Sequence, residues 1–142
     1  MKTARRQARE IALQALYAWQ VSGGDPLEEA RCLEGFEKNS AFTEVIVRGV
    51  RDRAPELKSL ISPYLDREFA KLSPVERAIL YIGAFELASQ SETPFKVVIN
   101  EAIELGKSFG GTEGHRFVNG VLEKIAEALR PEEVAKARTR IV

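Results

Sequence analysis

The apolar positions of this sequence recur every three or four residues through most of its length, which is the pattern of amphipathic α-helices. No segment sustains the period-two alternation that is typical of a half-buried β-strand. We therefore expect six main helices, at about 2–20, 27–36, 41–65, 74–88, 95–108 and 112–129. The segment 131–142 is expected to add one or two helical turns or to fray.

Capping residues and prolines refine two of these helices. Ser73 and Pro74 open the fourth helix and Glu76 stands at its third position, so the sequence predicts a capping box there. Pro55 lacks a backbone N–H and clashes with the preceding turn. The third helix is therefore expected to bend or restart near Ala54.

Short loops between the helices favour antiparallel neighbours. We predict an all-α fold of two packed antiparallel helical bundles that share a core, with helices one to three in the first bundle and four to six in the second. The chain is expected to be one domain, 1–142, with bundles at about 1–67 and 72–130 and a tail at 131–142.

The fourth helix is apolar around most of its circumference and is expected to be the central, most buried helix. Glu86 falls within that apolar surface. Because an unpaired buried carboxylate is costly, Glu86 is expected to accept hydrogen bonds from a neighbour, with backbone N–H groups at another helix start as one source.

The first helix has an unusual charge pattern, because four cations precede its first acid, Glu10, and oppose the helix dipole. These cations are Lys2, Arg5, Arg6 and Arg9. A helical wheel places Arg6, Arg9 and Tyr17 on one flank of the buried face. Cations interleaved with an aromatic ring suit single-stranded nucleic acid, because they hold phosphates while the ring stacks on a base. The alternative interpretation is a solvated helix end.

Composition limits the function further. The chain has 142 residues, a formal net charge of zero and a pI of about 6.6, so any affinity for nucleic acid must come from a local patch. Its single cysteine, Cys32, excludes an intrachain disulfide and is typical of a reducing compartment. No apolar run approaches the roughly 18 residues of a transmembrane helix. We expect a cytoplasmic protein with no membrane association.

The sequence offers no active site that we can identify. Its only histidine, His115, has no Cys, Asp or Glu at ligand spacing, so we predict neither a metal nor another cofactor, no catalytic residue and no enzymatic activity. The junction of the fifth and sixth helices is the second stretch of interest, because it carries Lys107, His115 and Arg116. Phe117, which follows them, is interpreted as a packing residue or as a stacking platform.

Three long motifs resemble the NusB family of bacterial transcription antitermination factors. They are ARRQAREIALQALYAWQ, LSPVERAILYIGAFEL and PFKVVINEAIELGKSFGGTEGHRFVNGVLEKIA. The resemblance implies an all-helical fold of two bundles. It also implies binding to the single-stranded boxA element of nascent ribosomal RNA, together with ribosomal protein S-ten (NusE), and docking on the RNA polymerase antitermination complex. Relatives indicate both monomers and dimers, so a homodimer is among the expected states.

The resemblance also implies roles for individual residues. Arg5, Arg6 and Arg9 match the arginine-rich RNA-binding start of the family, and Phe117 and Tyr64 match positions near the same surface. Glu76, with Arg77 beside it, matches the side associated with NusE. Two alternatives remain. One is an RNA-binding domain of the kind fused to rRNA methyltransferases, although those chains continue into a catalytic domain and this one ends at Val142. The other is a protein-interaction bundle that binds no RNA.

Overall fold

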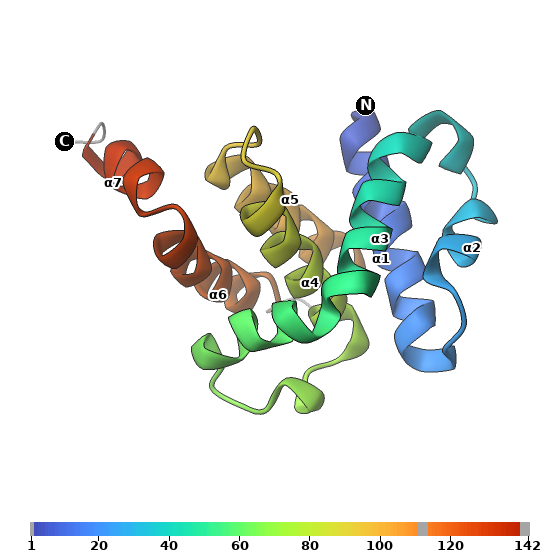
Figure 1. The fold of residues 1–142 in the computed structure, drawn as a ribbon, viewed down its shortest axis with the longest axis horizontal. Helices are drawn as coiled ribbons and strands as arrows, with labels where there is room; N and C mark the ends of the chain where they lie inside the picture. The colour runs from blue at the N-terminus through green and yellow to red at the C-terminus, as the bar shows by residue number, and fades with distance from the viewer. Residues whose placement is uncertain (1, 111–113, 140–142) are drawn as a thin grey trace.

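The computed structural model describes residues 2–110 and 114–139 of the chain. Throughout these residues the regular structure is helical, and no strand is present, so the predicted all-α class is confirmed (Figure 1). The elements are α1 (Ala4–Ser22), α2 (Pro26–Arg31), α3 (Phe36–Ile61), the 3₁₀ turns η1 (Ser62–Tyr64) and η2 (Phe69–Lys71), α4 (Pro74–Ser89), α5 (Phe95–Phe109), α6 (Gly114–Leu129) and α7 (Pro131–Thr139).

Most predicted helices agree with these bounds to within two residues, but the second and third differ. The second helix is shorter than expected, because the chain leaves α2 after Arg31 and passes through Gly35, at φ 89°, before α3 begins. α3 begins and ends about five and four residues earlier than predicted. Of the two outcomes expected for the tail, the helical turns are correct, since it forms α7. The predicted cap of the sixth helix, Thr112, lies outside the described residues.

The predicted bend in α3 is confirmed. Arg53 has φ −115° and ψ 16°, which are not helical values, two residues before Pro55. Figure 1 shows the consequence, because the second part of α3 turns away from the first and runs beneath α4. Asn39 departs from helical geometry in the same way, at the polar segment where a break was expected.

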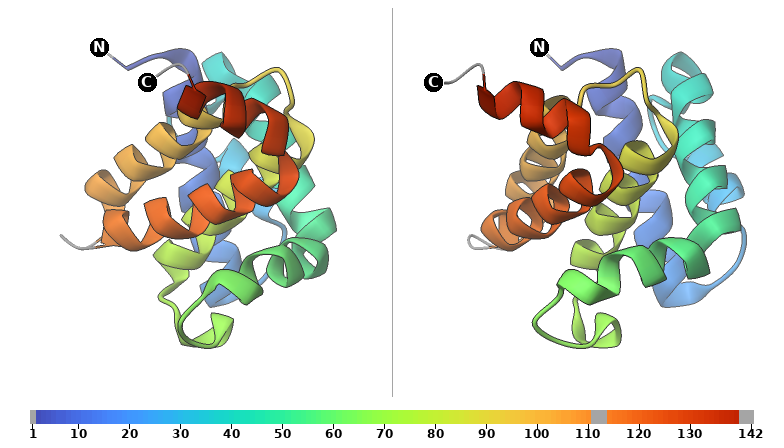
Figure 2. Two further views of the ribbon diagram at one scale, coloured as in Figure 1. Left: turned by 90° about the vertical axis from the view of Figure 1, so that its left-hand side faces the viewer. Right: turned by 60° about the vertical axis from the view of Figure 1, so that its left-hand side comes forward.

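Helix α4 is the centre of the molecule. Its predicted capping box is present, since the Ser73 hydroxyl accepts from the Glu76 backbone N–H at 3.1 Å and the Glu76 carboxylate accepts from the Ser73 N–H at 3.0 Å. Ten consecutive residues of α4 are buried, from Ala78 to Leu87. The helix packs against α1, α3, α5 and α6, and both views of Figure 2 show it running between them.

Two glycines allow the close packing around α4. A Cβ atom at Gly49 of α3 would lie 2.1 Å from the Phe85 ring, and one at Gly83 of α4 would lie 2.7 Å from a Leu122 methyl group of α6. A larger side chain at either position would require the Phe85 or the Leu122 side chain to shift from its packed position.

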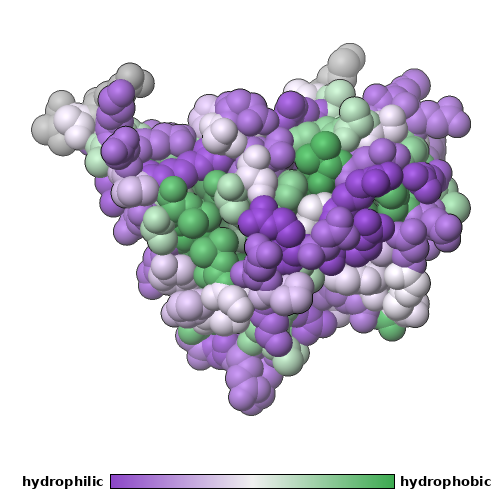
Figure 3. All heavy atoms as spheres, viewed as in Figure 1, coloured by the Kyte–Doolittle hydropathy of each residue, from purple (hydrophilic) through white to green (hydrophobic). Residues whose placement is uncertain are grey.

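The surface is mixed in character. On the face seen in Figure 1, apolar side chains gather over α6 and towards α4, and polar side chains surround them (Figure 3). None of the helices in the described ranges combines the length and the apolar character that crossing a membrane requires.

Candidate nucleic-acid interface

Arg9 does not lie on the surface of α1 but in the core. Its side chain is 3% exposed and donates from Nε and Nη2 to the two carboxylate oxygens of Glu86, at 2.9 and 2.7 Å. Glu86 is 1% exposed. The pair is bidentate, the geometry in which a guanidinium and a carboxylate satisfy each other best. The expectation that Glu86 has hydrogen-bond donors is therefore correct, but they belong to an arginine side chain and not to the backbone of a helix start.

The expectation that Arg9 is accessible on the flank of α1 is wrong. The helical wheel placed Arg9 beside the buried face, where it would hold a phosphate, but both Arg9 and Leu13 are enclosed by the packing of α1 against α3, α4 and α5. The buried face of α1 is wider than its apolar residues indicate, because it also includes Arg9, whose partner Glu86 is buried. Arg9 therefore serves the core and is not accessible to RNA phosphates.

Arg6 lies one turn earlier and remains accessible. Its side chain is 38% exposed and donates from Nε and Nη2 to Glu101 of α5, at 3.1 and 2.8 Å. The hydrogen bond from Arg6 holds the pKa of the Glu101 carboxyl below its ordinary value, while partial burial acts in the opposite direction. Arg9 also reaches Glu101, at 3.5 Å. Glu101 thus joins the buried arginine to the exposed one.

The remaining candidates on α1 are exposed. Arg5 is exposed and places its guanidinium carbon 4.2 Å from the centroid of the Phe42 ring of α3. Lys2 donates to Glu10 at 3.0 Å. The Tyr17 side chain is 42% exposed, further along the same helix.

The end of α5 and the start of α6 form the second part of the candidate interface, at the left edge of the left-hand view in Figure 2. They pack closely, since a Cβ atom at Gly106 would lie 3.3 Å from the Cα of His115. Lys107 is exposed, and its Nζ lies 3.9 Å from Oε1 of Glu104. Arg116 is exposed as well. The buried Nδ1 atom of His115 has no hydrogen-bond partner among the described residues.

The Phe117 side chain is partly buried and packs against the core. The guanidinium of Arg67, in the loop between η1 and η2, lies 5.2 Å from the centroid of its ring. η1, which carries the partly buried Tyr64, also contacts α6. Arg67 was not among the candidate residues predicted from the sequence, although it is a cation only three residues after the candidate Tyr64.

The two residues assigned to a protein partner both have structural contacts. Glu76 belongs to the capping box of α4. Arg77 donates from Nε to Gln20 at 2.7 Å, and from Nη1 to the backbone carbonyls of Ala70 and Leu72 at 2.9 and 2.8 Å. Arg77 therefore ties the loop before α4 to the end of α1, and both residues remain partly exposed.

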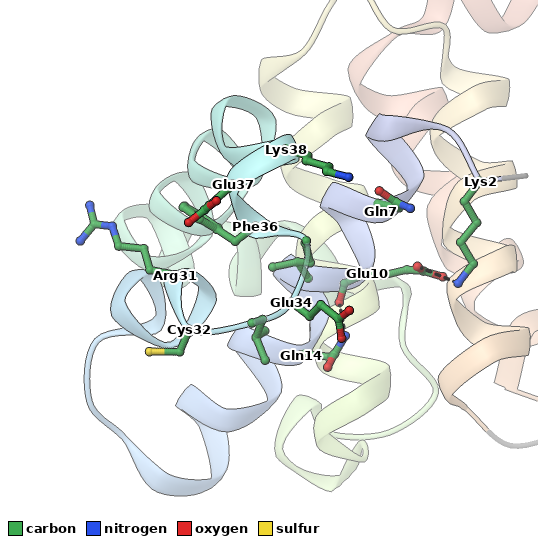
Figure 4. Close-up of a pocket in the computed structure, with 13 residues that line it drawn as sticks. Lys2, Gln7, Glu10, Gln14, Arg31, Cys32, Glu34, Phe36, Glu37 and Lys38 are labelled. Atoms are coloured by element: carbon green, nitrogen blue, oxygen red, sulfur yellow. Dashed lines mark hydrogen bonds and ion pairs between the residues drawn. The ribbon is translucent and has the colours of Figure 1, made fainter.

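A large hollow lies beside Lys2, between α1 and the segment 31–38 (Figure 4). Its volume is about 960 Å³, and three basic and three acidic side chains line it. These are Lys2, Arg31, Lys38, Glu10, Glu34 and Glu37. Because the lining is balanced in charge, it favours a polyanion less than the cations of α1 and the α5–α6 junction do.

Elsewhere the described residues hold no group of three or more His, Cys, Asp or Glu side chains that could bind a metal ion. Gly120 in α6 is exposed, and a Cβ atom there would meet nothing within 4 Å. Neither of these features supplies a second candidate site.

Comparison with known proteins assigns the family. A family model described as the NusB family matches residues 6–127. The transcription antitermination protein NusB of Dechloromonas aromatica is 51% identical over 138 residues, which cover 94% of this chain and 85% of that protein. The protein of the same name from Bordetella pertussis is 48% identical, with coverage of 98% and 96%.

Solved structures agree with the sequence relatives. The structure of T. maritima NusB superposes with a TM-score of 0.84 at 30% identity, covering 95% of this chain and 99% of that one. A crystal structure of the antitermination factors NusB and NusE in complex with dsRNA matches with a TM-score of 0.79 at 27% identity, covering 90% and 99%.

Proposed function

Because the chain belongs to the NusB family, we propose that it is a transcription antitermination factor that binds the boxA element of nascent ribosomal RNA together with NusE. The observation that carries this proposal is the match to antitermination proteins over almost the whole chain, one of whose solved relatives is held with NusE and RNA. It acts as an assembly factor with no catalytic turnover of its own.

The RNA face that we propose consists of the exposed or partly exposed candidates on α1, at η1 and at the α5–α6 junction. Its members are Lys2, Arg5, Arg6, Tyr17, Tyr64, Lys107, His115, Arg116 and Phe117. The Arg6–Glu101 pair supports a continuous surface, because it joins α1 to α5, whose last turn carries Lys107. The cations attract phosphates, and unpaired bases offer faces and edges to the rings beside them.

NusE takes a second surface in this proposal, at the start of α4 where Glu76 and Arg77 remain partly exposed. Two modest interfaces that act together raise affinity through effective concentration. The complex then docks on RNA polymerase. A homodimer of this chain is a competing state if it covers the RNA face, and a mass measurement with and without RNA detects it.

The test is a binding titration against single-stranded boxA RNA and a scrambled RNA of the same length, with and without NusE, at several salt concentrations. We expect preference for boxA when NusE is present, and a log–log salt slope of about 0.7 per phosphate contact. A duplex form of the same RNA completes the comparison. Equal affinity for boxA and scrambled RNA in the presence of NusE would contradict the proposal.

The protein surface needs its own test. Glu76→Gln removes the charge and keeps much of the cap, whereas Glu76→Lys reverses the charge. If the start of α4 takes NusE, both variants weaken NusE binding, Glu76→Lys by more, and neither changes the RNA affinity of the protein alone. Unchanged NusE binding in both variants would place the partner surface elsewhere.

A further inference from the structure

We propose that Arg67 is an RNA-contact residue that stacks its guanidinium plane on one unpaired base. This inference rests on the proposed function and adds a base-reading element to it. The loop between α3 and α4 then belongs to the RNA face. Arg67, and not Phe117, stacks on the base, and the Phe117 ring supports the Arg67 side chain.

The contact with Phe117 is the first argument. The guanidinium carbon of Arg67 lies 5.2 Å from the ring centroid, within the range of a cation–π interaction. One face of the ring is therefore occupied by the protein itself, and the ring is partly buried against the core. Arg67 is 48% exposed whereas Phe117 is partly buried, so Arg67 is the more accessible of the two to a base.

The hydrogen bonds of Arg67 are the second argument. Its Nε and Nη2 donate to the two carboxylate oxygens of Asp66, at 2.8 and 3.3 Å, so one edge of the guanidinium is fixed. One edge is held by a carboxylate and the guanidinium carbon lies near the Phe117 ring, yet the side chain is 48% exposed. A planar group fixed in this way loses little further freedom when a base stacks on it, and Arg planes are common stacking partners for unpaired bases.

The surroundings of Arg67 offer space for a nucleotide. Arg67 borders a hollow of about 590 Å³ between the end of α3 and η2, a volume typical of small-ligand sites. Lys58 also lines this hollow, with its ammonium 5.8 Å from the centroid of the Phe69 ring. The carboxylates of Asp66 and Glu68 line the same hollow, so its charge is balanced, and it offers a base on Arg67 space rather than net positive charge.

A purely structural role makes a different prediction. If Arg67 only fastens the loop to α6, its loss removes an exposed cation–π contact and lowers stability slightly. RNA binding would then change only as far as the loop moves, and equally for every base of the RNA.

The experiment is a double-mutant cycle between the protein and the RNA. Wild type, Arg67→Ala and Arg67→Lys are titrated with boxA RNA and with a series of boxA RNAs that each lack one base. Arg138→Ala is the matched control, because Arg138 is 59% exposed and pairs with Glu127 at 2.8 Å, but on α7. Circular dichroism establishes that each variant is folded.

Both Arg67 variants are expected to bind boxA about five- to tenfold more weakly, at the lower end of what one stacked base contributes. Arg67→Lys keeps the charge but not the plane, so it should resemble Arg67→Ala. At one RNA position, loss of the base should weaken wild type but not Arg67→Ala. Arg138→Ala should bind like wild type.

Additive effects at every RNA position would overturn the inference, and so would wild-type affinity in Arg67→Lys. These outcomes are distinct from failure of the proposed function, in which the wild-type protein itself does not distinguish boxA from scrambled RNA.

Discussion

Arg6 and Arg9 lie one turn apart on α1, and both reach the carboxylate of Glu101, yet their environments differ. Arg9 is 3% exposed and is bound in a bidentate pair to Glu86, which is also buried. Arg6 is 38% exposed and pairs with Glu101, whose side chain is 14% exposed. The same residue type in the same helix therefore belongs to the core in one case and to the candidate interface in the other.

The basic start of α1 therefore contains two kinds of arginine, one in a buried ion pair and one in an accessible ion pair. A buried ion pair contributes less to net stability than its short distances indicate, because both charges lose their hydration, but the loss of one partner is severe. An exposed pair is weak and can be exchanged for another anion. The arginine-rich start thus has a structural role at Arg9, whereas Arg5 and Arg6 remain accessible and belong to the proposed RNA face.

The largest effect is expected from Arg9→Ala. It leaves the Glu86 carboxylate buried without its partner, so we expect a loss of about 3–5 kcal/mol in the free energy of unfolding. Urea denaturation followed by circular dichroism measures it. The control is the double variant Arg9→Met, Glu86→Leu, which removes both charges and should be more stable than Arg9→Ala. A loss below about 1 kcal/mol in Arg9→Ala would contradict the structural role of Arg9.

Arg130 extends the comparison to a second buried arginine. Its side chain is 8% exposed and donates to four backbone carbonyls at or just beyond the end of α4, those of Glu86, Leu87, Gln90 and Thr93. Arg130→Met keeps the apolar stem but leaves these acceptors without their donor, so we expect a loss of about 2–3 kcal/mol. RNA affinity, measured where the variant is folded, should not change. A selective loss of RNA binding would place Arg130 in the interface instead.

Arg6→Ala should affect RNA binding more than stability, which is the reverse of what is expected for Arg9→Ala and Arg130→Met. The unfolding free energy should change much less than in Arg9→Ala, because Arg6 is 38% exposed and solvent screens its pair with the partly buried Glu101. RNA binding should weaken, and its salt slope should fall by about 0.7, the value for one phosphate contact. Arg6→Lys retains the charge and should retain most of the slope. An unchanged slope in Arg6→Ala would remove Arg6 from the RNA face.

The smallest effect concerns Glu101. Its pKa is lowered in the folded protein, so its ionised form contributes stability above the ordinary pKa of a glutamate, about 4.3, and the contribution is lost as the pH falls through the lowered pKa. Wild type should therefore be slightly more stable than Glu101→Gln at neutral pH, with the difference vanishing in acid. Denaturation from pH 3 to pH 7 tests this prediction. If the stability difference between wild type and Glu101→Gln grew as the pH fell, the prediction would be wrong.

The sequence predicted features whose signals are local. The capping box needs only Ser73 and Glu76, three residues apart, and the bend in α3 follows from the missing N–H and the ring of Pro55. Both are present in the structure.

Features that depend on distant residues could not be predicted in this way. The partner of Arg9 is 77 residues away, and the helical wheel treats every arginine as exposed. The contact between Arg67 and Phe117 likewise depends on how the loop before α4 meets α6. The family resemblance assigned Arg6 and Arg9 to the same expected RNA surface and did not distinguish an arginine that faces solvent from one that faces a buried carboxylate.

The central position of α4 has a consequence for how the molecule opens. α1 and α3 pack on it from one bundle and α5 and α6 from the other, and both buried arginines are bound to residues at its end. Separation of either bundle therefore exposes apolar surface of α4 to water, so the two bundles should open together. The amide hydrogens of α4 should exchange with solvent only through global unfolding, as one cooperative unit with the helices around it.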